Sequence, residues 1–169
     1  MDAILAEMEH DEDVLDEPRD GWQDYLQRLA HGVRRVALSH PRAFPLVVSR
    51  PPEAPWLRPP LRSLATVEAF LGGLISEGFS DQAAVAAYRA FTSFLLGHLL
   101  LEVSVLGADV GPLDTLDDGE ERNAKPLTHS TVARLSDALA EDHSAEEFEE
   151  SLEELLDRIA LIRTETTAS

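Results

Sequence analysis

Apolar residues recur along most of this chain at spacings of three and four positions, whereas the alternating pattern of a β-strand is scarce. Spacings of three and four place side chains on one face of an α-helix, so the pattern predicts an all-α fold, a bundle of about seven helices. The expected helices are a short opening helix around residues 4–8, then 24–39, 42–49, 61–77, 81–106 and 128–140, and a last helix that opens at Ser144.

The stretch SEGFSDQAAVAAYRAFTSFLLGHLLLEVS, residues 76–104, is apolar on almost every side. Its first stripe is Ala84, Tyr88, Phe91, Leu95, His98 and Glu102, and its second is Val85, Thr92, Leu96, Leu99 and Val103. A helix with two apolar faces needs two apolar partners. We therefore expect this helix to pack on two sides.

Proline, glycine and serine mark the ends of the predicted helices. Pro45 should kink or shorten the helix at 42–49, and the proline-dense run at 50–60 predicts a rigid irregular loop because proline fixes φ. In EGFS, Gly78 suits the left-handed position after a helix, and Ser80 can cap the next one. The run from Ser144 to Glu147 has the pattern of a capping box.

The length of 169 residues indicates one domain with a substantial core. We expect the folded domain to cover residues 20–163, after an acidic segment at 1–19 and before a disordered tail at 164–169. The longest apolar run, residues 91–106, is interrupted by polar residues and falls short of the roughly 20 residues that a membrane span needs. With no cysteine and no signal-peptide pattern, the expectation is a soluble cytoplasmic protein without a membrane partner.

Charge argues against direct contact with nucleic acid. The formal net charge is −18, and residues 1–20 alone hold nine acids and one arginine. Such a chain repels phosphate backbones, and it has no basic stripe with interleaved aromatic residues. The acidic runs are interpreted as solvated helix faces and loops.

Four elements occur in order: an HP dipeptide that begins a short helix, an RP-rich linker, a GFS corner before a long helix with AYR, and an LG step toward an acidic residue. In the runs LSHPRAFPLVVSRPP, EGFSDQAAVAAYRAF and LLGHLLLE they resemble the C-terminal ligand-sensing and dimerisation domain of the tetracycline-repressor (TetR) family. The resemblance covers roughly residues 20–105, and MDAILAE looks like the end of the family's linking helix. It implies a cytoplasmic transcriptional regulator, a repressor, that acts as a homodimer and whose DNA-binding helix-turn-helix precedes this chain. The residues present would then sense and dimerise without reading DNA.

The resemblance also gives the long helix its two partners: an interior effector cavity, and a four-helix dimer interface formed with the last helix. The aromatic walls imply a hydrophobic or aromatic effector. The candidate ligand-binding residues are Phe44, Val48, Trp56, Val67, Phe70, Leu71, Tyr88, Phe91, Phe94, His98 and Glu102. The candidate dimer-interface residues are Leu96, Leu99, Val103, Phe148, Leu152, Leu155 and Ile159.

His98 and Glu102 lie one helical turn apart and share a face. They could bind the effector or, less simply, a metal ion. Alternatively, Glu102 holds His98 in a buried hydrogen-bonded pair, or pairs with an arginine such as Arg34, Arg35 or Arg89. A single histidine on an apolar face is more often structural, which favours this second interpretation.

Two rival functions follow from the same residues. The first is a standalone small-molecule-binding or antagonist protein, which would heterodimerise with full-length relatives and leave the dimer with one DNA-binding helix-turn-helix instead of two. An enzyme or metal carrier is disfavoured because the chain has no cysteine, no HExxH, no Glu-x-x-His pair and no glycine-rich phosphate loop. We therefore expect no catalytic residue, no metal site and no cofactor.

Overall fold

The structure is a computed structural model that describes residues 20–49, 51, 54, 57–61, 63–108 and 129–167, with side chains as far as Arg163. Six helices make up this described part, and it contains no strand beyond an isolated bridge between Arg58 and Leu61. The helices are α3 (Trp22–Ser39), α4 (Phe44–Val48), α5 (Leu64–Ser76), α6 (Asp81–Val105), α7 (Ser130–Ala140) and α8 (Ser144–Thr167). The predicted all-α class is confirmed. The short helix predicted around residues 4–8 lies outside the described residues.

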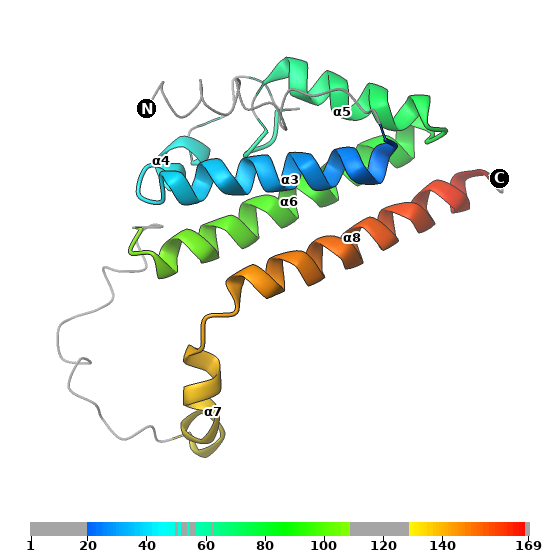
Figure 1. Cartoon of the computed structure of the whole chain (residues 1–169). Coiled ribbons are helices and arrows are strands. Elements are labelled where there is room, and N and C mark those ends of the chain that lie inside the picture. The colour runs from blue at the N-terminus through cyan, green and yellow to red at the C-terminus, as the bar shows by residue number, and fades with distance from the viewer. Residues whose placement is uncertain are drawn as a thin grey trace.

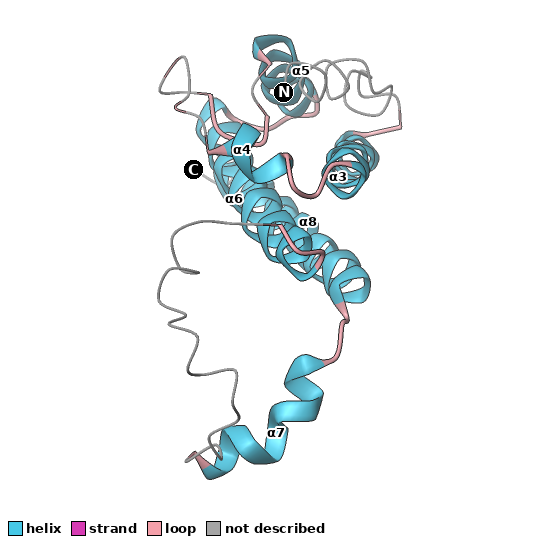
Figure 2. Ribbon diagram, turned by 90° about the vertical axis from the view of Figure 1, so that its left-hand side faces the viewer, coloured by secondary structure: helices cyan, strands magenta, loops and turns pink. Residues whose placement is uncertain are grey.

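The long helix α6 is the centre of the fold. It contacts α3, α4, α5 and α8, and α5 and α8 lie on opposite sides of it (Figures 1 and 2). Ten of its residues are buried, so it does have packing partners on more than one side. By length and composition alone α6 could also cross a membrane, a criterion that the core helix of a globular domain meets as well.

The corner between α5 and α6 forms as its sequence predicts. Gly78 adopts a φ of 94°, its N–H donates to the Ile75 carbonyl at 3.0 Å, and the Phe79 N–H donates to the Leu74 carbonyl at 3.1 Å. These two bonds make a Schellman motif, which satisfies carbonyl groups at the end of a helix. The Ser80 side chain then accepts from the Ala83 N–H at 3.1 Å and caps α6.

Several predicted helix ends shift. Pro45 stands in the first turn of α4, where its missing N–H is not needed, so α4 is short rather than kinked. The helix predicted from residue 61 begins at Leu64 instead, because Leu61 bridges to Arg58. The helix α8 continues through residues 164–167, which the sequence analysis assigned to a disordered tail.

The capping box predicted at the start of α8 is wrong. The Ser144 hydroxyl and backbone N–H both bond Asp142 Oδ1, at 2.6 and 3.1 Å, and Ser144 is already the first helical residue. The Glu147 N–H instead donates to the His143 carbonyl at 2.9 Å. The helix therefore begins at Ser144 itself, one residue earlier than it would if Ser144 were its N-cap.

The helix α7 stands apart from the packed helices (Figures 1 and 2). None of its residues is buried, and its apolar side chains Val132, Leu135 and Leu139 are all exposed. The hydrophobic core is therefore built by α3, α4, α5, α6 and α8, together with the loop residues Leu57 and Leu61.

Candidate functional site

A cluster of aromatic rings fills the interior between α3, α5 and α6. Phe70 of α5 is its hub: its ring centroid lies 5.5 Å from that of Tyr88, 5.4 Å from Phe91 and 6.4 Å from Tyr25. All four rings are buried. Six of the predicted ligand-binding residues belong to this continuous core, namely Phe44, Val48, Val67, Phe70, Tyr88 and Phe91. Leu71 packs against it from a partly buried position, and Trp56 lies outside the described residues.

Polar groups at the edge of this cluster are hydrogen-bonded. The Tyr88 hydroxyl accepts from the Arg58 N–H at 3.0 Å, and the Thr92 hydroxyl donates to the Tyr88 carbonyl at 2.9 Å. Burial is the main cause that raises the pKa of Tyr88 above its ordinary value. The loop at 57–61 is thereby tied to α6 through a side chain that the sequence analysis had placed in the effector site.

Three predicted ligand residues belong elsewhere. Phe94 and His98 turn toward α8, where their rings lie 5.7 and 5.2 Å from the Phe148 ring. Glu102 lies 3.9 Å from His98 and bonds Arg34 of α3. The α6 residues predicted for one site therefore lie on helix faces that meet different neighbours. Phe94, His98 and Glu102 fill a seam between helices and do not line the Phe70 cluster.

Glu102 is the partner of Arg34. The Arg34 Nη2 and Nε donate to its two carboxylate oxygens at 2.6 and 3.0 Å, and the guanidinium stacks 5.0 Å from the centroid of Phe148. The hydrogen bond that Arg34 donates to Glu102 is the main cause that raises the pKa of Arg34 above its ordinary value. Of the alternatives left open by the sequence, the arginine pair is confirmed. The pair joins α3 to α6, and the stacking adds α8.

His98 has a structural role at the same seam. Its Nε2 lies 3.2 Å from the Ser144 carbonyl oxygen, at the start of α8, and 3.9 Å from Glu102 Oε2. Within the described residues no group of three or more His, Cys, Asp or Glu side chains could hold a metal ion. Phe148 and Ser144 complete this seam, and sequence reasoning missed their part in it because they lie more than forty positions from His98.

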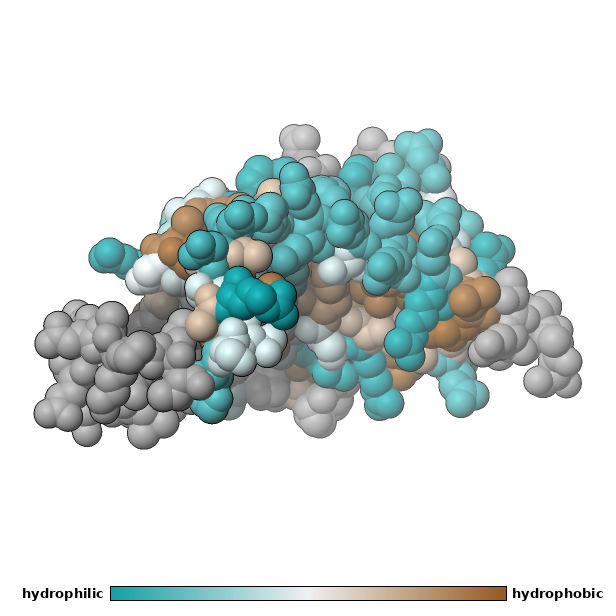
Figure 3. Space-filling view, turned by 90° about the horizontal axis from the view of Figure 1, so that it is seen from below, coloured by the Kyte–Doolittle hydropathy of each residue, from teal (hydrophilic) through white to brown (hydrophobic). Residues whose placement is uncertain are grey.

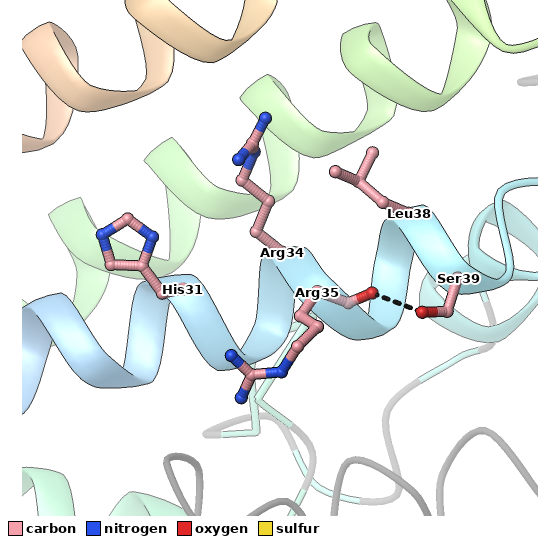
Figure 4. Close-up of a pocket in the computed structure, with 5 residues that line it drawn as sticks. All are labelled: His31, Arg34, Arg35, Leu38 and Ser39. Atoms are coloured by element: carbon pink, nitrogen blue, oxygen red, sulfur yellow. Dashed lines mark hydrogen bonds between the residues drawn. The ribbon is translucent and has the colours of Figure 1, made fainter.

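An open pocket of about 440 Å³ lies along the outside of α3. It is lined by His31, Arg34, Arg35, Leu38 and Ser39, which repeat along one helix at spacings of one, three and four (Figure 4). His31 Nε2 lies 3.4 Å from Glu149 of α8, so this side of α3 is linked to α8. None of these five residues was predicted as part of a site.

Five of the predicted dimer-interface side chains are buried within their own chain: Leu99, Val103, Phe148, Leu152 and Ile159. They form the packing between α6, α8 and α3, so a second copy cannot reach them while this packing is kept. Only Leu96 and Leu155 remain partly accessible. In the single chain these five positions belong to the hydrophobic core.

Comparisons with known proteins place this fold. The fold is an all-α bundle around one long central helix, with an aromatic interior on one side and a second long helix on the other. Residues 16–161 match the family model described as the tetracyclin repressor-like, C-terminal domain, so the chain belongs to this family. It is a family of transcriptional regulators rather than of enzymes. Among curated proteins no sequence matches the chain significantly.

Two solved structures share the fold. A possible TetR family transcriptional regulator from Streptomyces coelicolor A3(2) superposes with a TM-score of 0.66 at 23% identity, over 94% of this chain and 75% of that one. A TetR from Acinetobacter baumannii AYE superposes with a TM-score of 0.61 at 24% identity, over 96% of this chain and 71% of that one.

Proposed function

We propose that this chain senses a largely apolar, ring-bearing small molecule and forms a homodimer, and so controls DNA binding by a helix-turn-helix that lies outside its 169 residues. The observation that carries the sensing role is the buried cluster around Phe70, to which α3, α5 and α6 each contribute a ring. Apolar walls with a few polar groups are typical of small-molecule sites in proteins. We place this activity in the cytoplasm and assign it no catalysis.

A thermal-shift screen with neutral aromatic compounds tests the sensing role. A ligand that binds only the folded chain raises the melting temperature in proportion to the logarithm of its concentration above Kd. We expect Phe70→Leu to raise the concentration needed for a given shift by about fivefold or more, because ring contacts are lost. Leu135→Ala on the separate helix α7 is the matched control and should leave the shift unchanged. If no compound gives a saturable shift, the sensing role is refuted.

The dimer face that we propose lies on the outer side of α6 and the adjoining flank of α8. On α6 it is formed by Ala90, Gly97 and Leu101, of which Leu101 is 72% exposed. A side chain added at Gly97 would meet no atom within 4 Å, so this face is open. Seen from below, the molecule is mostly hydrophilic, with hydrophobic surface in separate patches (Figure 3).

The contacts of α8 with α3 indicate which flank of α8 belongs to the proposed dimer face. Glu149 faces His31, which directs that side of α8 toward α3. By helical spacing Leu155 and Ile162 lie on the opposite flank of α8, and both are only partly buried. Pairing these surfaces across a two-fold axis would bury them against their own copies, as symmetric dimers do.

Light scattering at about 10 µM tests this face. The wild type should have the mass of a dimer, and Leu101→Glu should shift it toward the monomer because the interface would bury an unpaired charge. Leu155→Glu should act in the same direction. Leu64→Glu is the matched control, since Leu64 is 64% exposed but lies on α5, away from the proposed face. A monomeric wild type, or dimers in all three variants, would contradict the assignment.

A further inference from the structure

The Tyr25 hydroxyl is buried without a partner. The Tyr25 side chain is 0% exposed, and its Oη has no hydrogen-bond partner in the described part of the chain. Its ring lies against Phe70, at the α3 side of the aromatic cluster. Folded proteins satisfy the large majority of their buried polar side chains, so a buried hydroxyl without a partner requires an explanation.

The second tyrosine of the chain, Tyr88, lies in the same cluster and has a hydrogen-bonded hydroxyl. Tyr88 also touches Phe70, yet its hydroxyl accepts from the Arg58 N–H at 3.0 Å. The chain therefore has the means to satisfy a phenol at this depth, and at Tyr25 it does not. The two tyrosines contribute the same chemical group to one ring cluster: the Tyr88 hydroxyl is hydrogen-bonded, and the Tyr25 hydroxyl has no partner in the described part of the chain.

Burial also keeps the Tyr25 proton in place. Desolvation raises its pKa to about 12, against a smaller opposing effect of the Arg28 charge. The group is therefore an O–H at every physiological pH and can donate a hydrogen bond. The neighbouring rings are apolar, and the Arg28 guanidinium, whose Nη2 is also buried, lies close enough to affect this pKa, so the surroundings favour an acceptor oxygen on a largely apolar molecule.

We propose that Tyr25 Oη is the polar anchor of a small-molecule site in the Phe70 cluster, and that its ligand is a ring-bearing, largely apolar molecule with an acceptor oxygen such as that of a ketone. This inference rests on the proposed sensing function and adds to it one specificity-determining residue and one ligand feature. The rings of Phe70, Tyr88 and Phe91 would contact the apolar body of the ligand, and the Tyr25 O–H would donate to its oxygen.

Two probes of matched shape separate these roles: 2-acetylnaphthalene, which carries a carbonyl oxygen, and 2-ethylnaphthalene, which does not. Each is titrated into the full chain by calorimetry or fluorescence, with wild type, Tyr25→Phe and Tyr88→Phe. We expect the wild type to bind the ketone about fivefold or more tightly than the hydrocarbon, which corresponds to one hydrogen bond. In Tyr25→Phe the preference should fall to less than about twofold, while Tyr88→Phe should retain it.

A second measurement needs no substitution at Tyr25. In protein labelled with 3-fluorotyrosine, the two fluorine resonances are assigned with Tyr88→Phe, and the Tyr25 resonance should move with the ketone more than with the hydrocarbon. An equal preference for the ketone in wild type and Tyr25→Phe would overturn the anchor and leave the sensing site in place. Failure of both probes to bind the wild type would also overturn it, and the sensing role would then be decided by the wider compound screen.

Discussion

Replacing Glu102 by methionine removes both acceptors of the Arg34 guanidinium. Glu102 is 8% exposed and Arg34 is 20% exposed at the side chain, so the pair is shielded from most water. Removing one partner of a buried ion pair costs about 3–5 kcal/mol, because the other charge stays desolvated and unpaired. Arg34 keeps some contact with solvent, so we expect Glu102→Met to lower the free energy of unfolding by about 3 kcal/mol.

The converse variant should cost more. Arg34→Met leaves the more deeply buried carboxylate of Glu102 without its partner and also removes the stacking on Phe148. We expect a loss of about 4 kcal/mol. In the double variant Arg34→Met/Glu102→Met neither charge remains and two apolar side chains face each other. Its loss should be at least about 2 kcal/mol smaller than the sum of the single losses, since directly contacting groups are not additive.

Urea unfolding followed by far-UV circular dichroism measures all three variants. One protein concentration must be used throughout, because self-association would add to the apparent stability. Asp24→Asn is the control: it breaks the more exposed pair of Asp24 with Arg28, at 2.8 Å, and should cost less than about 0.5 kcal/mol. If the losses at Arg34 and Glu102 add to within about 0.5 kcal/mol, the pair does not hold α3 and α6 together as argued.

Three further outcomes follow from local geometry and charge. An unfolded tyrosine ionises near pH 10, whereas the pKa of Tyr25 in the folded chain is raised to about 12. The free energy of unfolding should therefore be unaffected by this group below pH 10 and fall by up to about 1.4 kcal/mol per pH unit between pH 10 and 12. Urea titrations should show a flatter decline for Tyr25→Phe. A hydrogen bond with Glu141 is the main cause that raises the pKa of His143, and Glu141→Gln should lower that pKa in an NMR titration; an unmoved midpoint would exclude this cause. Gly78→Ala, at a φ of 94°, should lower the free energy of unfolding by about 1–2 kcal/mol, whereas Gly72→Ala, inside α5 with no atom within 4 Å of the added Cβ, should raise it by about 0.5–1 kcal/mol. Calorimetry should therefore show melting temperatures that shift in opposite directions, and shifts of the same sign would contradict this.

The features that the sequence predicts correctly are those decided by neighbouring residues. The corner of Gly78 and Ser80 forms because left-handed backbone and side-chain capping involve atoms only a few positions apart. The long helix from Asp81 is confirmed because its periodicity is sustained over 25 residues. The last helix opens at Ser144 as predicted, but the capping box there was wrong because Asp142, one residue before His143, competes for the hydroxyl of Ser144.

The site was predicted less completely because its partners are distant in sequence. Periodicity placed Glu102 inside, but Arg34, Arg35 and Arg89 were equal candidates until the structure brought α3 against α6. Leu99 and Leu152, which were predicted for the dimer interface, are buried within their own chain. An apolar stripe has the same pattern whether it packs within a chain or between chains, and only the tertiary arrangement separates the two.

The order of residues around α6 has a mechanical consequence for the proposed function. Phe91 faces the Phe70 cluster, Phe94 one turn later faces Phe148 of α8, and Gly97 lies on the open outer face. Because side chains are fixed to one helix and the interior is close-packed, a displacement of α6 that enlarges the space beside Phe91 must also move Phe94 against α8. In the proposed function, α6 is therefore the element through which occupancy of the aromatic interior would alter the geometry of the proposed dimer face.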